Sequence, residues 1–255
     1  MRYLVSTVRV ASAAILSSGL LFVSPLQAET VNSTGSVLLI SDYLFRGISQ
    51  TDEGPALQGS LTLATESGWY ASAWGSNIKF GQGSMELDIS AGRSFAVAPD
   101  WTVDLGLMQY RYPKGDNSTD QFNFIEGYGK LIYQDWTFGL ALTDDYFGAG
   151  VGKFWYLSAD WNQQLTDQLQ LQWHLGYNKF ANALEFKNFL ASASEDGSGY
   201  TDWGVKLNTT QLGLNWSVGY AGTSVNSSAC SELCDNRWIA SIGKKIGRAS
   251  CRERV

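Results

Sequence analysis

Segments in which apolar and polar residues alternate recur along most of this chain, and they constrain its fold more than any other feature. From Ser36 onward they run for about ten to fourteen residues each, with turn residues between them. Alternation with a period of two places successive side chains on opposite faces of a β-strand. Twelve strands are therefore predicted, over 36–49, 55–66, 69–79, 85–98, 101–113, 121–133, 136–147, 153–164, 169–180, 200–208, 212–221 and 237–245.

The two faces of these segments differ strongly in polarity. The segment 169–180 has Leu169, Leu171, Trp173, Leu175 and Tyr177 on one face, and Gln170, Gln172, His174, Gly176 and Asn178 on the other. Large apolar residues recur in this way on nearly every segment, whereas the opposite face is too polar to form a core. This pattern favours lipid on the outside of a closed sheet and water on the inside.

The connections between segments alternate in length. The short ones are 67–68, 99–100, 134–135, 165–168 and 209–211, and the longer ones include 114–120, 181–199 and 222–236. Membrane barrels have short periplasmic turns and longer outer loops, and an even strand number brings both termini to the periplasmic side. We therefore predict an all-β fold, a single antiparallel transmembrane β-barrel of about twelve strands in the bacterial outer membrane.

The two ends of the chain do not belong to this pattern. Residues 1–28 have the layout of a signal peptide, with Arg2 and Arg9 before an apolar stretch and Ala28 at a plausible cleavage site. Residues 246–255 match the translation of a sequencing adapter and are interpreted as an artefact. The barrel domain is expected over 29–245. No second apolar run long enough for a membrane helix follows the signal, which excludes a helical membrane protein.

Charge and cysteine content narrow the function further. Without the two end segments, 18 − 5 = 13 basic and 24 − 1 = 23 acidic residues remain, so residues 29–245 carry about −10, which argues against nucleic acid as a partner. Cys230 and Cys234 are candidates for a small disulfide loop in an exported protein. Two free thiols are the next alternative. A metal site ranks last because the lone histidine, His174, lies 56 residues upstream.

Aromatic residues suggest two interfacial belts. Trp69, Trp101 and Trp136 each open a strand directly after a short turn, which places them at one membrane interface. The opposite belt is expected to contain Phe80, Tyr110, Tyr112, Phe122, Tyr146, Phe147, Tyr177, Phe180, Tyr200 and Trp238.

Charged residues on the polar face should line the lumen. They are Asp42, Arg46, Glu86, Asp88, Asp104, Glu126, Lys130, Asp145, Asp160, His174, Asp202 and Lys206. Acids outnumber bases, which predicts a narrow porin-like channel for ions or small solutes with a weak preference for cations. Asp42 and Arg46 stand too far apart along one strand to pair, so each should meet a partner on a neighbouring strand. The alternative is that these charges only stiffen a plugged barrel that is structural or binds a partner through its outer loops.

An enzymatic role receives less support. Some outer-membrane barrels are lipases, and His174 could serve such chemistry. However, His174 should face the lumen rather than the lipid, and no G-x-S-x-G motif accompanies it. We therefore expect no catalytic residues, no metal and no cofactor.

The run from Ser41 to Thr51, SDYLFRGISQT, resembles the N-terminal signature of the TorF-type porin family, also called the Gcw_chp family. Further likenesses are ESGWY at 66–70 with WGSN at 74–77, ELD at 86–88, DYFG at 145–148 and TDW at 201–203. The resemblance covers about 36–245 and implies an outer-membrane pore with no assigned substrate. It also implies membrane lipid, lipopolysaccharide and the barrel assembly machinery as partners, besides small solutes. The family's aromatic-ended last strand is replaced here by the adapter-like residues.

Overall fold

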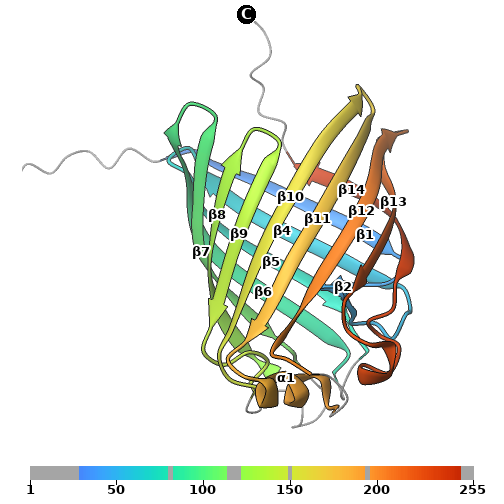
Figure 1. Cartoon of the computed structure of the whole chain (residues 1–255). Coiled ribbons are helices and arrows are strands. Elements are labelled where there is room, and N and C mark those ends of the chain that lie inside the picture. The colour runs from blue at the N-terminus through green and yellow to red at the C-terminus, as the bar shows by residue number, and fades with distance from the viewer. Residues whose placement is uncertain (1–28, 80–82, 114–121, 149–150, 193–195, 248–255) are drawn as a thin grey trace, which may run out of the picture.

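Twelve long strands close into a single barrel in the computed structural model, which describes residues 29–79, 83–113, 122–148, 151–192 and 196–247 (Figure 1). The barrel strands are β1 (Val31–Ile40), β4 (Ala56–Thr65), β5 (Trp69–Asn77), β6 (Met85–Ala98), β7 (Trp101–Arg111), β8 (Phe124–Tyr133), β9 (Trp136–Thr143), β10 (Phe154–Thr166), β11 (Leu169–Phe180), β12 (Gly199–Gln211), β13 (Leu214–Thr223) and β14 (Arg237–Gly247). Each pairs antiparallel with its chain neighbours, and β1 pairs with both β4 and β14. The predicted twelve-stranded antiparallel barrel is confirmed.

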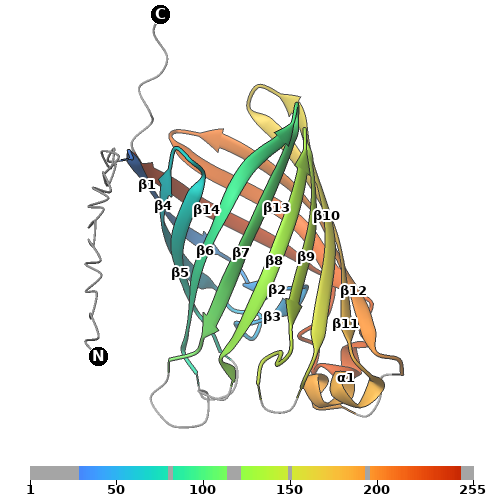
Figure 2. The same cartoon turned by 90° about the vertical axis from the view of Figure 1, so that its left-hand side faces the viewer.

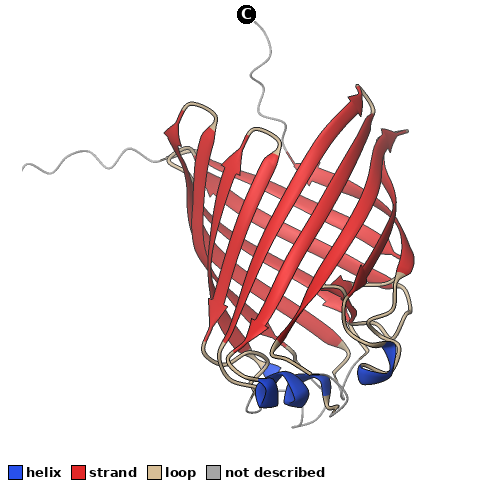
Figure 3. Ribbon diagram, in the orientation of Figure 1, coloured by secondary structure: helices blue, strands red, loops and turns tan. Residues whose placement is uncertain are grey.

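The two ends of the barrel differ, as Figure 2 shows. One end, here called the turn end, carries the tight connections and the start of β1 and the end of β14. The opposite loop end carries the longer connections, with helix α1 (Ala183–Leu190) and the short helix η2 (Ser227–Ala229), shown in blue in Figure 3. None of the helices in the described ranges is long and apolar enough to cross a bilayer.

One tight turn lies later in the chain than predicted. Leu212 and Gly213 both have positive φ, of 55° and 72°, and connect β12 to β13. Two successive positive φ values are typical of the two-residue hairpin turn whose twist matches that of the flanking strands. Glycine is favoured at the second position of this turn. Leu212 is therefore not on the apolar face of a strand, as its alternation with Leu214 and Trp216 predicted, but in the turn, where it is 96% exposed.

The outer surface of the barrel is apolar. The cross-strand pairs Leu107–Gly127, Leu157–Tyr177 and Leu175–Trp203 lie on the outward face, and the large side chains among them are exposed or half-buried. On the inward face of the same strands lie polar residues such as Asp160, paired with His174. Since a soluble barrel would not expose a continuous apolar band, this surface contacts lipid.

The lipid-facing assignment predicts a depth-dependent cost for a charge on the outer face. Leu107 is 62% exposed and lies near the middle of β7. Leu107→Arg should lower the free energy of unfolding by about 2–4 kcal/mol, because the guanidinium would meet acyl chains. Thr62→Arg is the matched control, because Thr62 lines a cavity inside the barrel. Urea unfolding in phospholipid vesicles measures both, and equal losses for the two variants would contradict the assignment.

The first predicted strand is half wrong. β1 ends at Ile40 instead of Ser49, and residues 41–55 leave the barrel wall and fold inward. They contain the hairpin of β2 (Leu44–Phe45) and β3 (Ile48–Ser49), which turns at Arg46 and Gly47. Gly47 has φ +82°, and a Cβ there would overlap the Thr223 side chain and the Cβ of Asp202. The hairpin is therefore pressed against β12 and β13, where only glycine fits.

The end segments fall largely outside the described residues. The predicted signal peptide, 1–28, and residues 248–255 of the predicted artefact are among those that the structure does not describe. β14 continues two residues past the expected domain boundary, with Ile246 opposite Gly35 and Gly247 opposite Thr34.

Candidate functional site: a plugged lumen

The segment 41–55, here called the plug, is anchored on one side by Asp42. This carboxylate accepts hydrogen bonds from the hydroxyls of Ser49 and Thr51, at 2.7 and 2.8 Å, so it ties the plug to itself. It also pairs with Arg237 at the start of β14, where the Nη1–Oδ2 distance is 2.9 Å. Arg237 in turn contacts Glu53 at 3.0 Å. Asp42 and Arg237 are both mostly buried. Their ion pair joins the plug to a strand that lies 195 positions later in the sequence.

Arg46, at the tip of the plug hairpin, anchors the other side. Its Nη2 lies 2.8 Å from both carboxylate oxygens of Glu126 on β8, and the two side chains are only 7% and 2% exposed. Burial alone would lower the pKa of Arg46, but the Glu126 carboxylate raises it well above its usual range. The guanidinium also lies over aromatic rings, 4.5 Å from the centroid of Tyr156 and 4.8 Å from those of Phe45 and Phe154.

Asp42 and Arg46 were each expected to meet a partner on a neighbouring strand. This holds for Asp42, whose partner Arg237 is on β14, next to β1 in the barrel, but it is wrong for Arg46, whose partner Glu126 is on β8 across the lumen. Because the plug crosses the interior, it can contact strands that are distant around the wall. The role of Arg237 was missed, although its side chain shares the inward face of β14 with Ser241.

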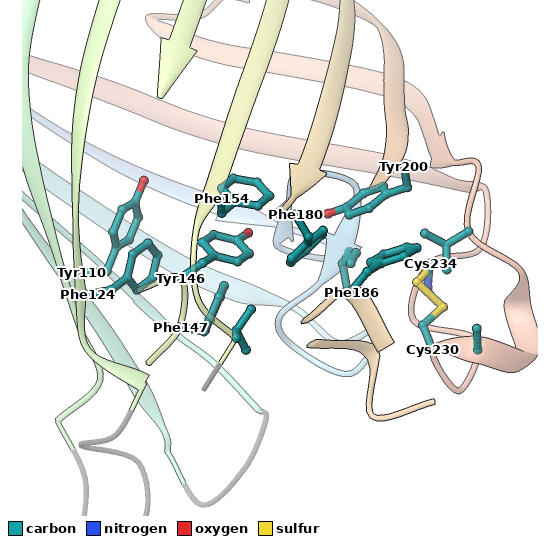
Figure 4. Packing of buried hydrophobic residues seen from close by; sticks show 14 of the residues in the cluster. Tyr110, Phe124, Tyr146, Phe147, Phe154, Phe180, Phe186, Tyr200, Cys230 and Cys234 are labelled. Carbon is teal, nitrogen blue, oxygen red and sulfur yellow. A yellow bond between two sulfur atoms is a disulfide. The ribbon is translucent and has the colours of Figure 1, made fainter. Parts of the chain in front are cut away.

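An apolar cluster fills the loop end of the barrel, between the plug and the outer loops. Figure 4 shows its rings packed together between the strand ends and the loops. The stacked pairs include Tyr146 with Phe154, at 3.8 Å between centroids, and Tyr110 with Phe124, at 4.3 Å. Phe186 of α1 packs on Phe180 at 5.1 Å. The buried members are Ile48, Ile78, Tyr110, Tyr112, Phe124, Tyr146, Phe147, Val151, Phe154, Phe180, Phe186, Tyr200, Val225, Ala229, Cys230 and Cys234.

This cluster corrects the predicted second aromatic belt. Tyr110, Tyr112, Tyr146, Phe147, Phe180 and Tyr200 are buried inside the barrel, and Phe122 packs against the same cluster. The sequence contained a sign of this inward position. Tyr110 lies six residues from Asp104 on β7, and residues an even number apart share one face of a strand, so both face inward. Tyr177 and Trp238 do lie on the outer face and are exposed. Phe80 lies outside the described residues.

The tryptophans at the turn end lie where the interface was expected. Trp69 and Trp136 are exposed, and Trp101 stacks on Tyr133 at 4.4 Å between centroids on the outward face of β7 and β8. The three indoles thus lie next to the tight turns, at the starts of β5, β7 and β9. Amphipathic indoles are favoured at the headgroup level.

On the side of the plug that faces the turn end, His174 is the centre of a polar network. Its Nδ1 lies 2.8 Å from Asp160 and its Nε2 2.9 Å from Asp202, while the Tyr156 hydroxyl contacts both Nε2 and Asp202. Asn178 donates to the second oxygen of Asp202 at 2.7 Å. Within the described residues the hydrogen-bond partners of His174 include no serine or cysteine. The arrangement is that of an ion and hydrogen-bond network in the barrel wall.

The remaining predicted lumen charges divide into three groups. Glu86 and Asp88 are buried beside the plug, and one oxygen of each has no hydrogen-bond partner among the described residues. Asp104 accepts a hydrogen bond from the Tyr70 hydroxyl at 2.6 Å and faces Lys130 across the β7–β8 pair. Lys206 faces Gln172 in the interior.

Asp145 does not lie on the lumen face of a strand. The predicted strand 136–147 ends at Thr143. Asp145 lies in an exposed turn, where its own backbone N–H donates to the Thr143 hydroxyl. The strand ends early because the following residues, Tyr146 and Phe147, turn inward into the apolar cluster.

Cys230 and Cys234 are joined as a disulfide in the β13–β14 connection. Both are buried in the apolar cluster. The neighbouring Leu233 accepts a backbone hydrogen bond from Ser49 of the plug at 2.9 Å. The bridged loop is thus in contact with the plug. Among the described residues, no group of three or more His, Cys, Asp or Glu side chains could hold a metal ion.

Among the cavities lined by the described residues, three lie inside the barrel between the apolar cluster and the turn end. The first, of about 660 Å³, lies at the turn end, and the second, of about 500 Å³, lies under the plug. They share Leu38, Gln172 and Lys206 in their linings, so they adjoin. A third, of about 360 Å³, lies against β4 to β9. Arg46 lines both the second and the third, which places its side chain between them.

These features together define an outer-membrane β-barrel protein, with an apolar outer surface, a polar interior and an inward-folded segment. The chain belongs to the Gcw_chp family, described as a bacterial protein of unknown function, whose model matches residues 26–246. The resemblance seen in the plug sequence is therefore confirmed. No curated protein sequence matches the chain.

Solved structures with the same fold are porins by their titles. The NanC porin shares 12% identity and a TM-score of 0.51, over 86% of this chain and 100% of that chain. The KdgM porin in complex with disordered oligogalacturonate shares 11% identity and a TM-score of 0.52, over 84% and 98%. At this level of identity the similarity shows the fold.

Proposed function

We propose that this protein is a porin-like channel through which ions and small polar solutes cross the outer membrane. The observation that carries the proposal is the adjoining pair of cavities that runs from the turn end to Arg46, the first of them lined mainly by polar groups, inside a barrel whose outside is apolar. Side chains alone would fill an eight-stranded barrel, whereas twelve strands leave room for water. The similarity in fold to two porins supports the same function.

The charge of the interior favours cations. The predicted inward-facing set had eight acids and three bases. Since Asp145 lies outside the lumen and Arg237 lies inside it, the inward-facing charges are seven acids and four bases, without counting His174. Arg46 and Arg237 are each committed to a carboxylate, whereas Asp104 and Asp160 line interior cavities and form no ion pair with a lysine or arginine within the described residues. An excess of carboxylate raises the local concentration of cations.

Ion selectivity tests this proposal. In a planar bilayer with a KCl gradient, the reversal potential should indicate a K⁺ over Cl⁻ permeability ratio of about two or more. Asp160→Asn, in the lining of the second cavity, should move the ratio toward one, and Glu66→Gln, in an exposed tight turn, is the matched control. An anion-selective current would refute the cation preference. Steady absence of current would refute the channel itself.

A second candidate function is a non-conducting barrel that binds a partner through its outer loops. The specific observation in its favour is the apolar cluster, because rings stacked across the loop end exclude water from the outer mouth. Single-channel recording separates the two candidates, since a permanently closed barrel gives no steady conductance.

A further inference from the structure

The cavity at the turn end has a lining that differs chemically from the rest of the interior. Its wall on β10, β11 and β12 carries five inward-facing amides, here called the amide ladder: Asn162, Gln164, Gln170, Gln172 and Asn208. Asn162 is opposite Gln172, Gln164 is opposite Gln170, and Gln170 is also opposite Asn208. The amides therefore form one contiguous patch, with neighbouring strands about 4.8 Å apart.

Most of these amides have unused hydrogen-bonding capacity. Asn162, Gln170, Gln172 and Asn208 make no side-chain hydrogen bond to any other residue in the described ranges, although each is half-buried. In the His174 network, by contrast, the polar side chains are paired with one another. Each free amide offers two N–H donors and a carbonyl acceptor in a fixed plane. The patch can therefore bind groups that both accept and donate hydrogen bonds.

The other walls of the cavity fit the same type of ligand. Hydroxyls line the opposite side, where Ser217 and Ser241 lie 2.7 Å apart. Leu38 adds an apolar surface against which the C–H face of a sugar ring can pack. Charged groups are confined to the ends, with Lys206 at the junction to the second cavity and Asp167, Lys244 and Lys245 exposed in the lining. The middle of the site is uncharged.

We propose that this cavity is a binding site for uncharged, hydroxyl-rich solutes, of which short neutral oligosaccharides are the chemical class. Sugar hydroxyls are simultaneous donors and acceptors, so they match amides better than they match carboxylates or ammonium groups. A cavity of about 660 Å³ lies within the range of small-molecule sites. The proposal rests on the proposed channel function, for which it names a solute class.

Saturation-transfer difference NMR tests the site directly, on the purified full chain in a detergent without a sugar headgroup. The probes are maltotriose, which is neutral, and trigalacturonate, an acidic trisaccharide. Maltotriose should receive saturation, and Gln170→Leu/Asn208→Leu should weaken its apparent affinity about tenfold, because two amide contacts are lost. Gln163→Leu is the matched control, since Gln163 is adjacent to Asn162 but faces lipid.

The outcomes separate the site from the channel. No saturation of maltotriose, equal weakening by Gln163→Leu, or preferential binding of trigalacturonate would each overturn the site. The heat-dependent mobility of the barrel on gels verifies that each variant is folded. Liposome swelling then measures permeation of maltotriose separately. Permeation without saturable binding refutes the site and leaves the channel intact. Binding without permeation supports the site and refutes its place on a permeation path, while the channel itself is tested by the bilayer current.

Discussion

Replacing residues 43–50 with a short Gly-Ser linker is expected to raise the single-channel conductance about fivefold. These residues include the hairpin β2–β3 and Arg46, whose side chain lies between two of the interior cavities. Their removal also takes Ile48 from the apolar cluster at the loop end, together with Phe45, which packs against it. The path at that end becomes wider, so more water and hydrated ions can pass.

A milder change keeps this prediction testable if the deletion does not fold. Arg46→Ala removes the guanidinium but leaves the hairpin, and it should raise conductance by a smaller factor. Lys79→Ala is the control, because the Lys79–Asp52 pair joins the plug to the wall at an exposed position, with side chains 71% and 53% exposed. Unchanged conductance in both plug variants would show that the outer loops alone close the barrel.

The second large effect concerns stability. Arg46→Met should lower the free energy of unfolding by about 3–5 kcal/mol, because the Glu126 carboxylate would stay buried without a partner. Lys79→Met, at the exposed pair, should cost less than about 1 kcal/mol. Urea unfolding of the refolded barrel, followed by tryptophan fluorescence, measures both variants.

The double variant Arg46→Met/Glu126→Leu provides the decisive comparison. It removes both charges and should recover most of the stability that Arg46→Met loses, since replacing a buried ion pair with apolar residues is often neutral. If Arg46→Met costs no more than Lys79→Met, the buried pair does not hold the plug in place.

The sequence by itself determined the barrel. Inward and outward faces follow from local alternation, as in the run from Leu169 to Asn178, and the tight turns are marked by residues such as Gly68. Both signals are local, because a strand's faces depend only on parity and a turn depends on a few dihedral angles. The sequence also placed His174, Asp160 and Asp202 on the inner face.

Only the tertiary structure decided what fills the lumen. Residues 41–49 alternate well enough to continue a strand, yet they turn inward because Arg46 binds Glu126, 80 positions away, and Asp42 binds Arg237, 195 positions away. No local pattern encodes such partners. For the same reason Tyr146 and Phe147 were assigned to the membrane interface: an aromatic ring is equally suited to lipid and to a buried cluster, and three-dimensional closure of the loop end settles which one it meets.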